Sequence, residues 1–191
     1  MSDRIGAEGF PLPLKKGSVQ PSKIMNPGLY SSATDKHNTP KWLVDKIGGF
    51  FDEIYLDPCT SAENPVGARS YFTEQDDGLS QEWGGRSVYM NPPYGRSIGD
   101  WTGKLVAEYQ RGFIDEAIAL LPARTDTGWW QGIAPYPVCF IRGRLKFNDC
   151  KQSAPFPSAL VYLGDNWQEF QKAFGDLGLI YVPVTYLARQ W

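Results

Sequence analysis

The sequence predicts an α/β fold in which a mostly parallel, seven-stranded sheet carries helices on both faces. Short apolar runs alternate with stretches in which apolar residues recur every three or four positions, as in folds built from strand–helix units. The run at residues 116–121 is continuously apolar after its first residue, which is typical of a strand covered on both faces. Polar residues and prolines directly follow two of the runs, and open α/β sheets bind their ligands at such strand ends.

The predicted elements follow in chain order. A first helix begins at Thr39-Pro40, because threonine caps helices and proline suits the first helical position, and it ends at Gly48-Gly49. A second helix covers residues 98–109. A last helix carries one apolar stripe, which consists of Trp167, Phe170, Phe174 and Leu177. The strands are expected at residues 54–56, 69–72, 87–90, 116–121, 138–141, 159–163 and 179–182.

The chain has 191 residues, a length that suits one domain. Residues 1–38 are rich in proline, glycine and serine and show little periodicity, so we expect an extended, partly disordered N-terminal arm. Residues 39–191 form the single folded domain. No apolar run approaches the ~20 residues that cross a bilayer, and the first residues lack the apolar core of a signal peptide. We therefore expect a cytoplasmic protein without a membrane partner.

Composition excludes several functional classes. The formal net charge is −2, so contact with nucleic acid must depend on a local basic patch rather than on the overall field. The chain contains one histidine and three cysteines without a CxxC pair. Zinc chemistry and a histidine-based triad are therefore not expected, and we predict no metal site.

The segment Asn91-Pro92-Pro93-Tyr94 follows a predicted strand and is the most informative motif. Two prolines remove two backbone donors and leave a rigid row of carbonyl acceptors, to which the asparagine adds an acceptor and the tyrosine a flat face. Such a site suits an NH₂ group on a planar ring. Hydrogen bonds from both N–H groups to Asn91 Oδ1 and the Pro92 carbonyl would hold the nitrogen toward tetrahedral geometry and make its lone pair available to a methyl group. The alternative is that the prolines only end the strand and Tyr94 packs in the core.

This motif resembles the catalytic motif of amino-methyltransferases that use S-adenosylmethionine, some of which act on adenine N6 and others on the side-chain amide of glutamine. A wider pattern over about residues 34–165 closely resembles the phage-type DNA N6-adenine methyltransferase family. Its members here are Thr39-Pro40, Leu56-Asp57-Pro58-Cys59, Asp77-Gly78-Leu79 with Trp83, Asn91-Pro92-Pro93-Tyr94, Leu120-Leu121-Pro122 with Trp129-Trp130, and Gly143-Arg144-Leu145-Lys146-Phe147.

The resemblance implies a Rossmann-like, S-adenosylmethionine-dependent methyltransferase fold. It implies a site-specific enzyme that methylates N6 of a flipped-out adenine in double-stranded DNA, in the cytoplasm of a bacterial host if a phage encodes it. The catalytic residues would be Asn91, Pro92, Pro93 and Tyr94. Two alternatives stay open: a methyltransferase acting on RNA or on a protein glutamine, and a catalytically silent DNA-binding relative.

The resemblance also implies a set of cofactor-binding residues, namely Thr39, Pro40, Asp57, Pro58, Cys59, Glu74, Asp77 and Asn91. Thr39-Pro40 at a helix start would face the cofactor's carboxylate. Glu74 would bind the ribose hydroxyls, and Asp77 would approach the adenine amine. No glycine-rich loop follows the first strand, so glycines cannot form the cofactor's cradle. Taken alone, these residues also fit a helix cap, a proline turn and an ordinary acidic loop.

On the nucleic-acid side, a base that undergoes chemistry must leave the stack, and Tyr94 would stack on it. Arg124, Arg144 and Lys146 would contact phosphates. In a strand at residues 143–147, Phe147 would point to the opposite face from Arg144 and Lys146. The resemblance implies that Phe147 helps to enclose the flipped base opposite Tyr94. The alternatives are a solvated hairpin and a core phenylalanine, and Trp129-Trp130 is expected to pack in the core.

Overall fold

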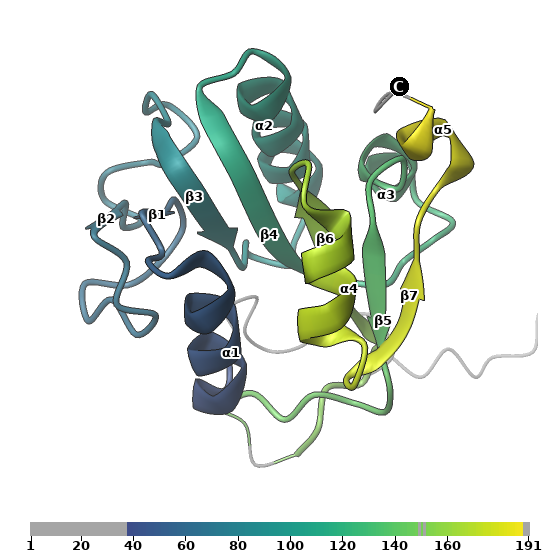
Figure 1. Ribbon diagram of the computed structural model, residues 1–191. Helices are drawn as coiled ribbons and strands as arrows, with labels where there is room; N and C mark the ends of the chain where they lie inside the picture. The colour runs from purple at the N-terminus through teal and green to yellow at the C-terminus, as the bar shows by residue number, and fades with distance from the viewer. Residues whose placement is uncertain (1–37, 149, 151, 189–191) are drawn as a thin grey trace, which may run out of the picture. The chain divides into compact units, whose positions relative to one another are not determined.

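A computed structural model describes residues 38–148, 150 and 152–188 of the chain (Figure 1). The predicted N-terminal arm, apart from Asn38, lies outside these residues. Each of the seven predicted strands overlaps a strand of the structure. The strands are β1 (Leu56–Asp57), β2 (Ser70–Tyr71), β3 (Gly85–Met90), β4 (Ile114–Pro122), β5 (Val138–Ile141), β6 (Ser158–Leu163) and β7 (Gly178–Tyr181).

The seven strands form one sheet in the order β2-β1-β3-β4-β6-β5-β7. The pairs β1–β2, β1–β3 and β3–β4 are parallel, whereas β4–β6, β5–β6 and β5–β7 are antiparallel. The prediction of a mostly parallel sheet is therefore wrong, because the sheet is mixed. An apolar run indicates that a strand is buried but carries no information on its direction, so the sequence pattern could not distinguish the two halves.

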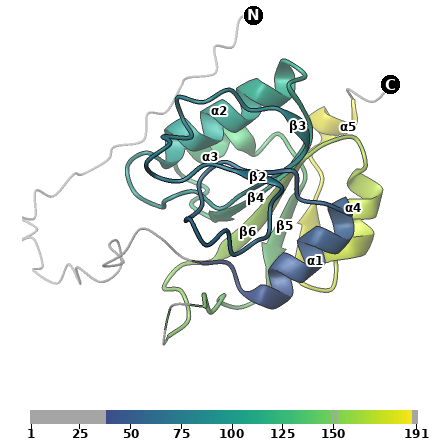
Figure 2. The same cartoon turned by 90° about the vertical axis from the view of Figure 1, so that its left-hand side faces the viewer.

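Helices cover both faces of the sheet. The helices are α1 (Lys41–Phe51), α2 (Ile98–Gln110), α3 (Gly128–Ile133), α4 (Trp167–Phe174) and α5 (Val184–Leu187). Figures 1 and 2 show α1 beside α4 on one face and α2 beside α3 on the other. Strand β5 separates the two layers, since Cys139 contacts the backbone of Phe174 in α4 while Phe140 packs against Trp130 in α3. Helices α1, α2 and α4 agree with the three predicted helices, whereas the short helices α3 and α5 were not predicted.

The core on the α1 side is largely aromatic. The ring of Phe170 stacks on Tyr162 at 5.0 Å and 10°, and Phe50 meets Tyr162 edge to face at 5.5 Å. Every residue of β6 is buried, as are the last six residues of β4 beside it. This continuous burial agrees with the apolar runs that predicted both strands.

Helix α1 begins differently from the prediction. It starts at Lys41 with Pro40 in the capping position, and no side chain caps it. The Pro40 carbonyl accepts hydrogen bonds from the N–H groups of Leu43 and Val44. The prediction that Thr39 caps the helix is therefore wrong. The Thr39 side chain takes part in contacts of the candidate site instead.

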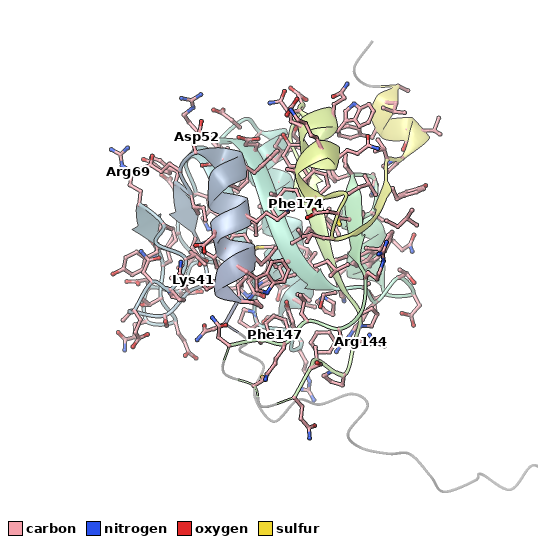
Figure 3. All side chains as sticks on the ribbon, turned by 60° about the horizontal axis from the view of Figure 1, so that its bottom comes forward. Lys41, Asp52, Arg69, Arg144, Phe147 and Phe174 are labelled. Atoms are coloured by element: carbon pink, nitrogen blue, oxygen red, sulfur yellow. The ribbon has the colours of Figure 1, made fainter. Side chains whose placement is uncertain are left out.

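The segment 143–147 is a loop after β5, so the prediction of a strand there is wrong. Its burial nevertheless alternates, with Leu145 and Phe147 buried and Arg144 and Lys146 exposed. Arg144 and Phe147 are labelled on this loop in Figure 3. The alternation indicated the two faces correctly, but a strand also requires a neighbour to pair with. Among the described residues, no helix is long and apolar enough to span a membrane.

Candidate active site

A cavity of about 290 Å³ opens where the parallel strands end. Three loops line it: residues after β1, the turn 73–79 after β2, and the segment after β3 that begins with Asn91. Asn38 and Thr39 before α1 and Trp101 from α2 complete the wall. This is the edge at which open α/β sheets bind ligands.

The cavity brings together most of the cofactor residues that the resemblance implied. Those in its wall are Thr39, Asp57, Cys59, Glu74, Asp77 and Asn91, together with Pro93 of the catalytic motif. Pro40, Pro58 and Pro92 are buried and do not line it. Segments that are more than 50 residues apart in the chain, such as Thr39 and Asn91, thus meet at one site.

A hydrogen-bonded chain connects three of these segments. Asn91 Nδ2 donates to Thr39 Oγ1 at 3.0 Å, and Thr39 Oγ1 lies 2.6 Å from the Tyr89 hydroxyl. The Thr39 carbonyl accepts a hydrogen bond from Asn148 Nδ2 at 3.0 Å, which connects the loop after β5 to the site. Thr39 and Tyr89 are both buried.

Asp57 is the buried carboxyl group of the site. Burial raises its pKa to about 7, although a hydrogen bond from the Cys59 N–H at 3.2 Å favours the charged form. A cation in the cavity would ionise this group near neutral pH. Burial and the neighbouring Asp57 raise the pKa of the Cys59 thiol well above its ordinary value, so Cys59 is not an activated nucleophile.

The other end of the cavity is apolar and closely packed. A Cβ atom at Gly78 would lie 2.0 Å from the Pro58 carbonyl oxygen, so only glycine allows this approach to the end of β1. Trp83 Nε1 donates to the Gly78 carbonyl at 2.7 Å, and Trp83 stacks on Trp101 with 6.1 Å between ring centroids. These contacts explain the spacing of Gly78 and Trp83 in the sequence. Sequence reasoning missed Trp101 as a cavity residue, because its helical spacing indicated only core packing.

Tyr94 does not line this cavity. It is buried, its hydroxyl donates to the Leu120 carbonyl at 3.2 Å, and its ring meets Phe147 and Phe156 edge to face at 6.2 and 5.4 Å. The structure therefore places Tyr94 and Phe147 side by side, as predicted. The two rings contact each other directly, however, so no base fits between them. In this arrangement both rings belong to the core, which is the alternative that the sequence left open.

The predicted DNA-binding cations lie apart from the cavity wall. Arg144 and Lys146 are exposed on the loop after β5, and Arg124 is half-buried after β4. Trp130 is buried, in agreement with the expected core packing, and Trp129 is half-buried. No cluster of three or more histidine, cysteine or carboxylate side chains suited to a metal occurs in the described part of the chain.

The sheet, the cavity at its parallel strand ends and the polar groups there define an α/β protein with a candidate ligand site at the edge where such sheets bind ligands. The chain belongs to the DNA N-6-adenine-methyltransferase (Dam) family, whose model matches residues 28–175.

A DNA N-6-adenine-methyltransferase of Escherichia phage T1 is 27% identical over 97 residues, which are 50% of this chain and 39% of that protein. The match thus spans well under half of the relative's length. Two solved structures are also similar. A dimethyladenosine transferase from Plasmodium falciparum is 12% identical, with a TM-score of 0.44 over 71% of this chain and 64% of that one. The 23S rRNA methyltransferase ErmE is 14% identical, with a TM-score of 0.43 over 69% and 70%.

Proposed function

We propose that the protein is a site-specific DNA methyltransferase that transfers a methyl group from S-adenosylmethionine to N6 of an adenine flipped out of double-stranded DNA. Family membership supports this reaction. The observation that carries it is the position of Asn91, at the carboxyl end of β3, in the wall of the cavity that also contains Asp57 and Thr39. The site for the methyl donor and the motif that accepts hydrogen bonds from the substrate amine would thus lie at the same edge of the sheet.

The chemistry of the cavity wall fits S-adenosylmethionine. The buried Asp57 carboxylate would bind the cofactor's ammonium group, and the backbone N–H groups at the start of α1, beside Thr39, would meet the cofactor's carboxylate. Glu74 would accept hydrogen bonds from the ribose hydroxyls, and Leu79 and Trp101 offer apolar surface to the adenine ring. When bound, this cofactor supplies an electrophilic methyl group.

The chain itself would activate the amine. Asn91 Oδ1 and the Pro92 carbonyl would each accept one N–H of the adenine amine and hold its nitrogen toward tetrahedral geometry. This arrangement reduces delocalisation of the lone pair into the ring. Preorganised acceptors of this kind stabilise the positive charge that develops on the nitrogen during transfer. The extra proton then leaves to water, and no histidine is required.

The DNA would approach across the basic loop residues. Arg124, Arg144 and Lys146 would contact phosphates, which makes binding dependent on salt. Tyr94 would provide the stacking face for the extruded base. Because its ring contacts Phe147 and Phe156, the base can reach it only if these two rings move away. In a bacterial host the substrate would be the DNA of the cytoplasm.

The test is a transfer assay with methyl-tritiated cofactor on amplified duplex DNA, which carries no N6-methyladenine. RNA and host protein extract serve as parallel substrates. We expect label in N6-methyladenine of the duplex, and a much lower rate for Asn91→Ala. Label confined to RNA or to glutamine of protein would replace the DNA proposal with the corresponding alternative. Binding of duplex without any transfer would indicate a silent relative.

A further inference from the structure

Asn91 can accept a hydrogen bond from the substrate amine only if the oxygen of its side-chain amide, rather than the nitrogen, faces the substrate. The terminal torsion of an asparagine is broad, so its oxygen and nitrogen exchange places unless neighbours distinguish them. A flipped amide would present N–H donors to an amine that itself donates. The proposed reaction therefore needs a device that fixes the orientation of this side chain.

The structure contains such a device in the hydroxyl pair formed by Thr39 and Tyr89. The two hydroxyl oxygens are 2.6 Å apart, and Asn91 Nδ2 donates to Thr39 Oγ1 at 3.0 Å. Tyr89 is fully buried, and Thr39 is 4% exposed, so water competes little for these bonds. The pair connects the segment before α1 to the end of β3.

Strand geometry places Tyr89 and Asn91 so that both reach Thr39. Tyr89 lies in β3 and Asn91 follows its last residue, Met90. Side chains two positions apart on extended backbone lie on the same face. The pairing of Tyr89 with Ile118 of β4 fixes the register at this point. Thr39 is held from the other side, because Asn148 bonds the carbonyl groups of both Asn38 and Thr39.

Hydrogen-bond direction gives the pair its effect. A threonine hydroxyl has one proton and two lone pairs. Either hydroxyl can be the donor of the 2.6 Å bond between Thr39 and Tyr89. In the arrangement in which Thr39 donates its proton to the Tyr89 oxygen, only lone pairs of Thr39 face Asn91, and only the amide nitrogen of Asn91 can donate to them. The amide oxygen of Asn91 then lies on the side of the amide group that faces away from Thr39. Without the Tyr89 hydroxyl, Thr39 can also donate to Asn91 Oδ1, so the contact with Thr39 no longer distinguishes the two orientations of the amide.

We infer that Tyr89 is a positioning residue of the methyl-transfer reaction, acting through Thr39 to hold the nitrogen of the Asn91 amide and direct its oxygen toward the substrate amine. This inference rests on the proposed function. Burial raises the pKa of Tyr89 well above its ordinary value, so the phenol stays neutral and acts by hydrogen bonding rather than by exchanging a proton.

The first test is Tyr89→Phe, which removes one hydroxyl and keeps the ring. We expect kcat to fall about tenfold, which corresponds to about 1.4 kcal/mol in the barrier. The affinity for S-adenosylmethionine and the KM for DNA should stay within about twofold. Tyr162→Phe is the matched control, because it removes another buried hydroxyl, one that contacts Glu116 rather than the site. The control should keep the parent kcat.

A double-mutant cycle shows whether Tyr89 acts through Asn91. In an Asn91→Ala background, Tyr89→Phe should cost no further turnover, whereas a general structural effect would lower kcat by the same factor in both backgrounds. Thr39→Val, which removes the hydroxyl that connects Tyr89 to Asn91, should lower kcat at saturating cofactor in the parent protein but not in the Asn91→Ala background. This second cycle gives the same decision if Tyr89→Phe folds poorly.

An unchanged kcat for Tyr89→Phe, or additive effects in the cycle, would overturn the inference and leave the proposed function intact. Absence of methyl transfer by the parent protein to any DNA would instead refute the proposed function. The two failures are therefore distinguishable.

Discussion

The two halves of the sheet bury their strands equally well but use their polar groups differently. In the parallel half, β2-β1-β3-β4, buried polar side chains gather at the carboxyl ends and face a cavity. In the antiparallel half, the Tyr162 hydroxyl donates to Glu116 at 2.9 Å and accepts from the Asn166 N–H, both away from that cavity. Burial alone therefore does not distinguish the half that contains the candidate site. That half differs in having a cavity in whose wall polar groups from distant segments meet.

The family match covers the whole parallel half but only part of the antiparallel half. The matched residues end at position 175, before β7 and α5. Strand β7 lies at the edge of the sheet and exposes Leu179 and Tyr181, whereas the cavity residues all lie inside the matched range. Substitutions in the two halves should consequently separate stability from activity.

The largest expected effect is on stability, in the antiparallel half. Phe170→Ala removes a fully buried ring that stacks on Tyr162 and contacts Phe174. We expect a loss of about 3–5 kcal/mol in the free energy of unfolding, measured by denaturant titration. Cofactor affinity of the protein that remains folded should not change. Leu179→Ala, at a residue that is 72% exposed, should stay within about 0.5 kcal/mol of the parent. Equal losses for both variants would contradict the assignment of the core.

The next effect is on turnover, in the parallel half. Asn91→Ala removes the side-chain acceptor and leaves the two prolines in place. We expect kcat to fall by roughly 10²-fold or more, as for other preorganised contacts to a transition state. The free energy of unfolding and the cofactor affinity should change much less. A variant that transfers methyl groups at the parent rate would show that Asn91 is not the acceptor.

Gly78→Ala tests the close approach between the turn after β2 and the end of β1. The added Cβ would collide with the Pro58 carbonyl, and overpacking of this kind costs about 1–3 kcal/mol. Because the displaced turn lines the cavity, we expect weaker binding of S-adenosylmethionine in calorimetry together with the loss of stability. Gly84→Ala is the matched control, since nothing lies within 4 Å of its added Cβ. If both variants bind equally well, the packing at Gly78 does not shape the cavity.

The sequence predicted the strands well, because strands that are buried consist mainly of apolar residues. It also predicted that Asp57 and Asn91 would meet, since both follow strands of the parallel half. The direction of β6 and β7 could not be predicted in this way, because a short apolar run is the same in either orientation. The loop at 143–147 shows the converse. Its alternation was read correctly, but pairing depends on whether another strand lies beside it.

The missed site residues share one property: their local pattern has an ordinary structural explanation. Trp101 fits the apolar stripe of α2, and Tyr89 fits an apolar strand, so neither attracted attention. Thr39 fitted a helix cap, and only the structure shows that its hydroxyl bonds to Tyr89 and Asn91 instead. Hydrogen bonds between residues about 50 positions apart leave no mark in local periodicity.

The pH dependence of cofactor binding depends on Asp57, whose pKa is raised to about 7. Below that pH the free protein carries a protonated carboxyl, and binding of an ammonium group must expel the proton. We expect the affinity for S-adenosylmethionine to fall up to tenfold per pH unit below about 7. Above about pH 8 the α-amino group itself loses its charge, so affinity should be highest between these values.

The stability of the cofactor-free protein should show the opposite trend. The pKa of Asp57 is about 7 in the folded state and 3.8 in the unfolded state, so its protonation stabilises the fold. This contribution is complete below pH 3.8 and is lost as the pH rises through about 7. Asp57→Asn should abolish both the acidic loss of affinity and this part of the stability change. Cofactor affinity that is constant from pH 5.5 to 7 would mean that Asp57 does not meet the ammonium group.

The smallest expected effect is that of a single exposed cation on the loop after β5. Lys146 is exposed between the buried residues Leu145 and Phe147, so it can contact a phosphate without disturbing the core. One phosphate contact adds about 0.9 to the slope of log K against log salt concentration. Lys146→Ala should therefore weaken binding of duplex DNA equally for all sequences, by about threefold at low salt, and flatten the slope by about one unit.

Lys172→Ala, on α4 and paired with Glu169, should leave the slope unchanged. A slope for Lys146→Ala that equals the parent's would exclude Lys146 from the DNA interface. It would also separate Lys146 from its neighbour Phe147, whose burial makes it a determinant of stability whether or not this loop meets DNA.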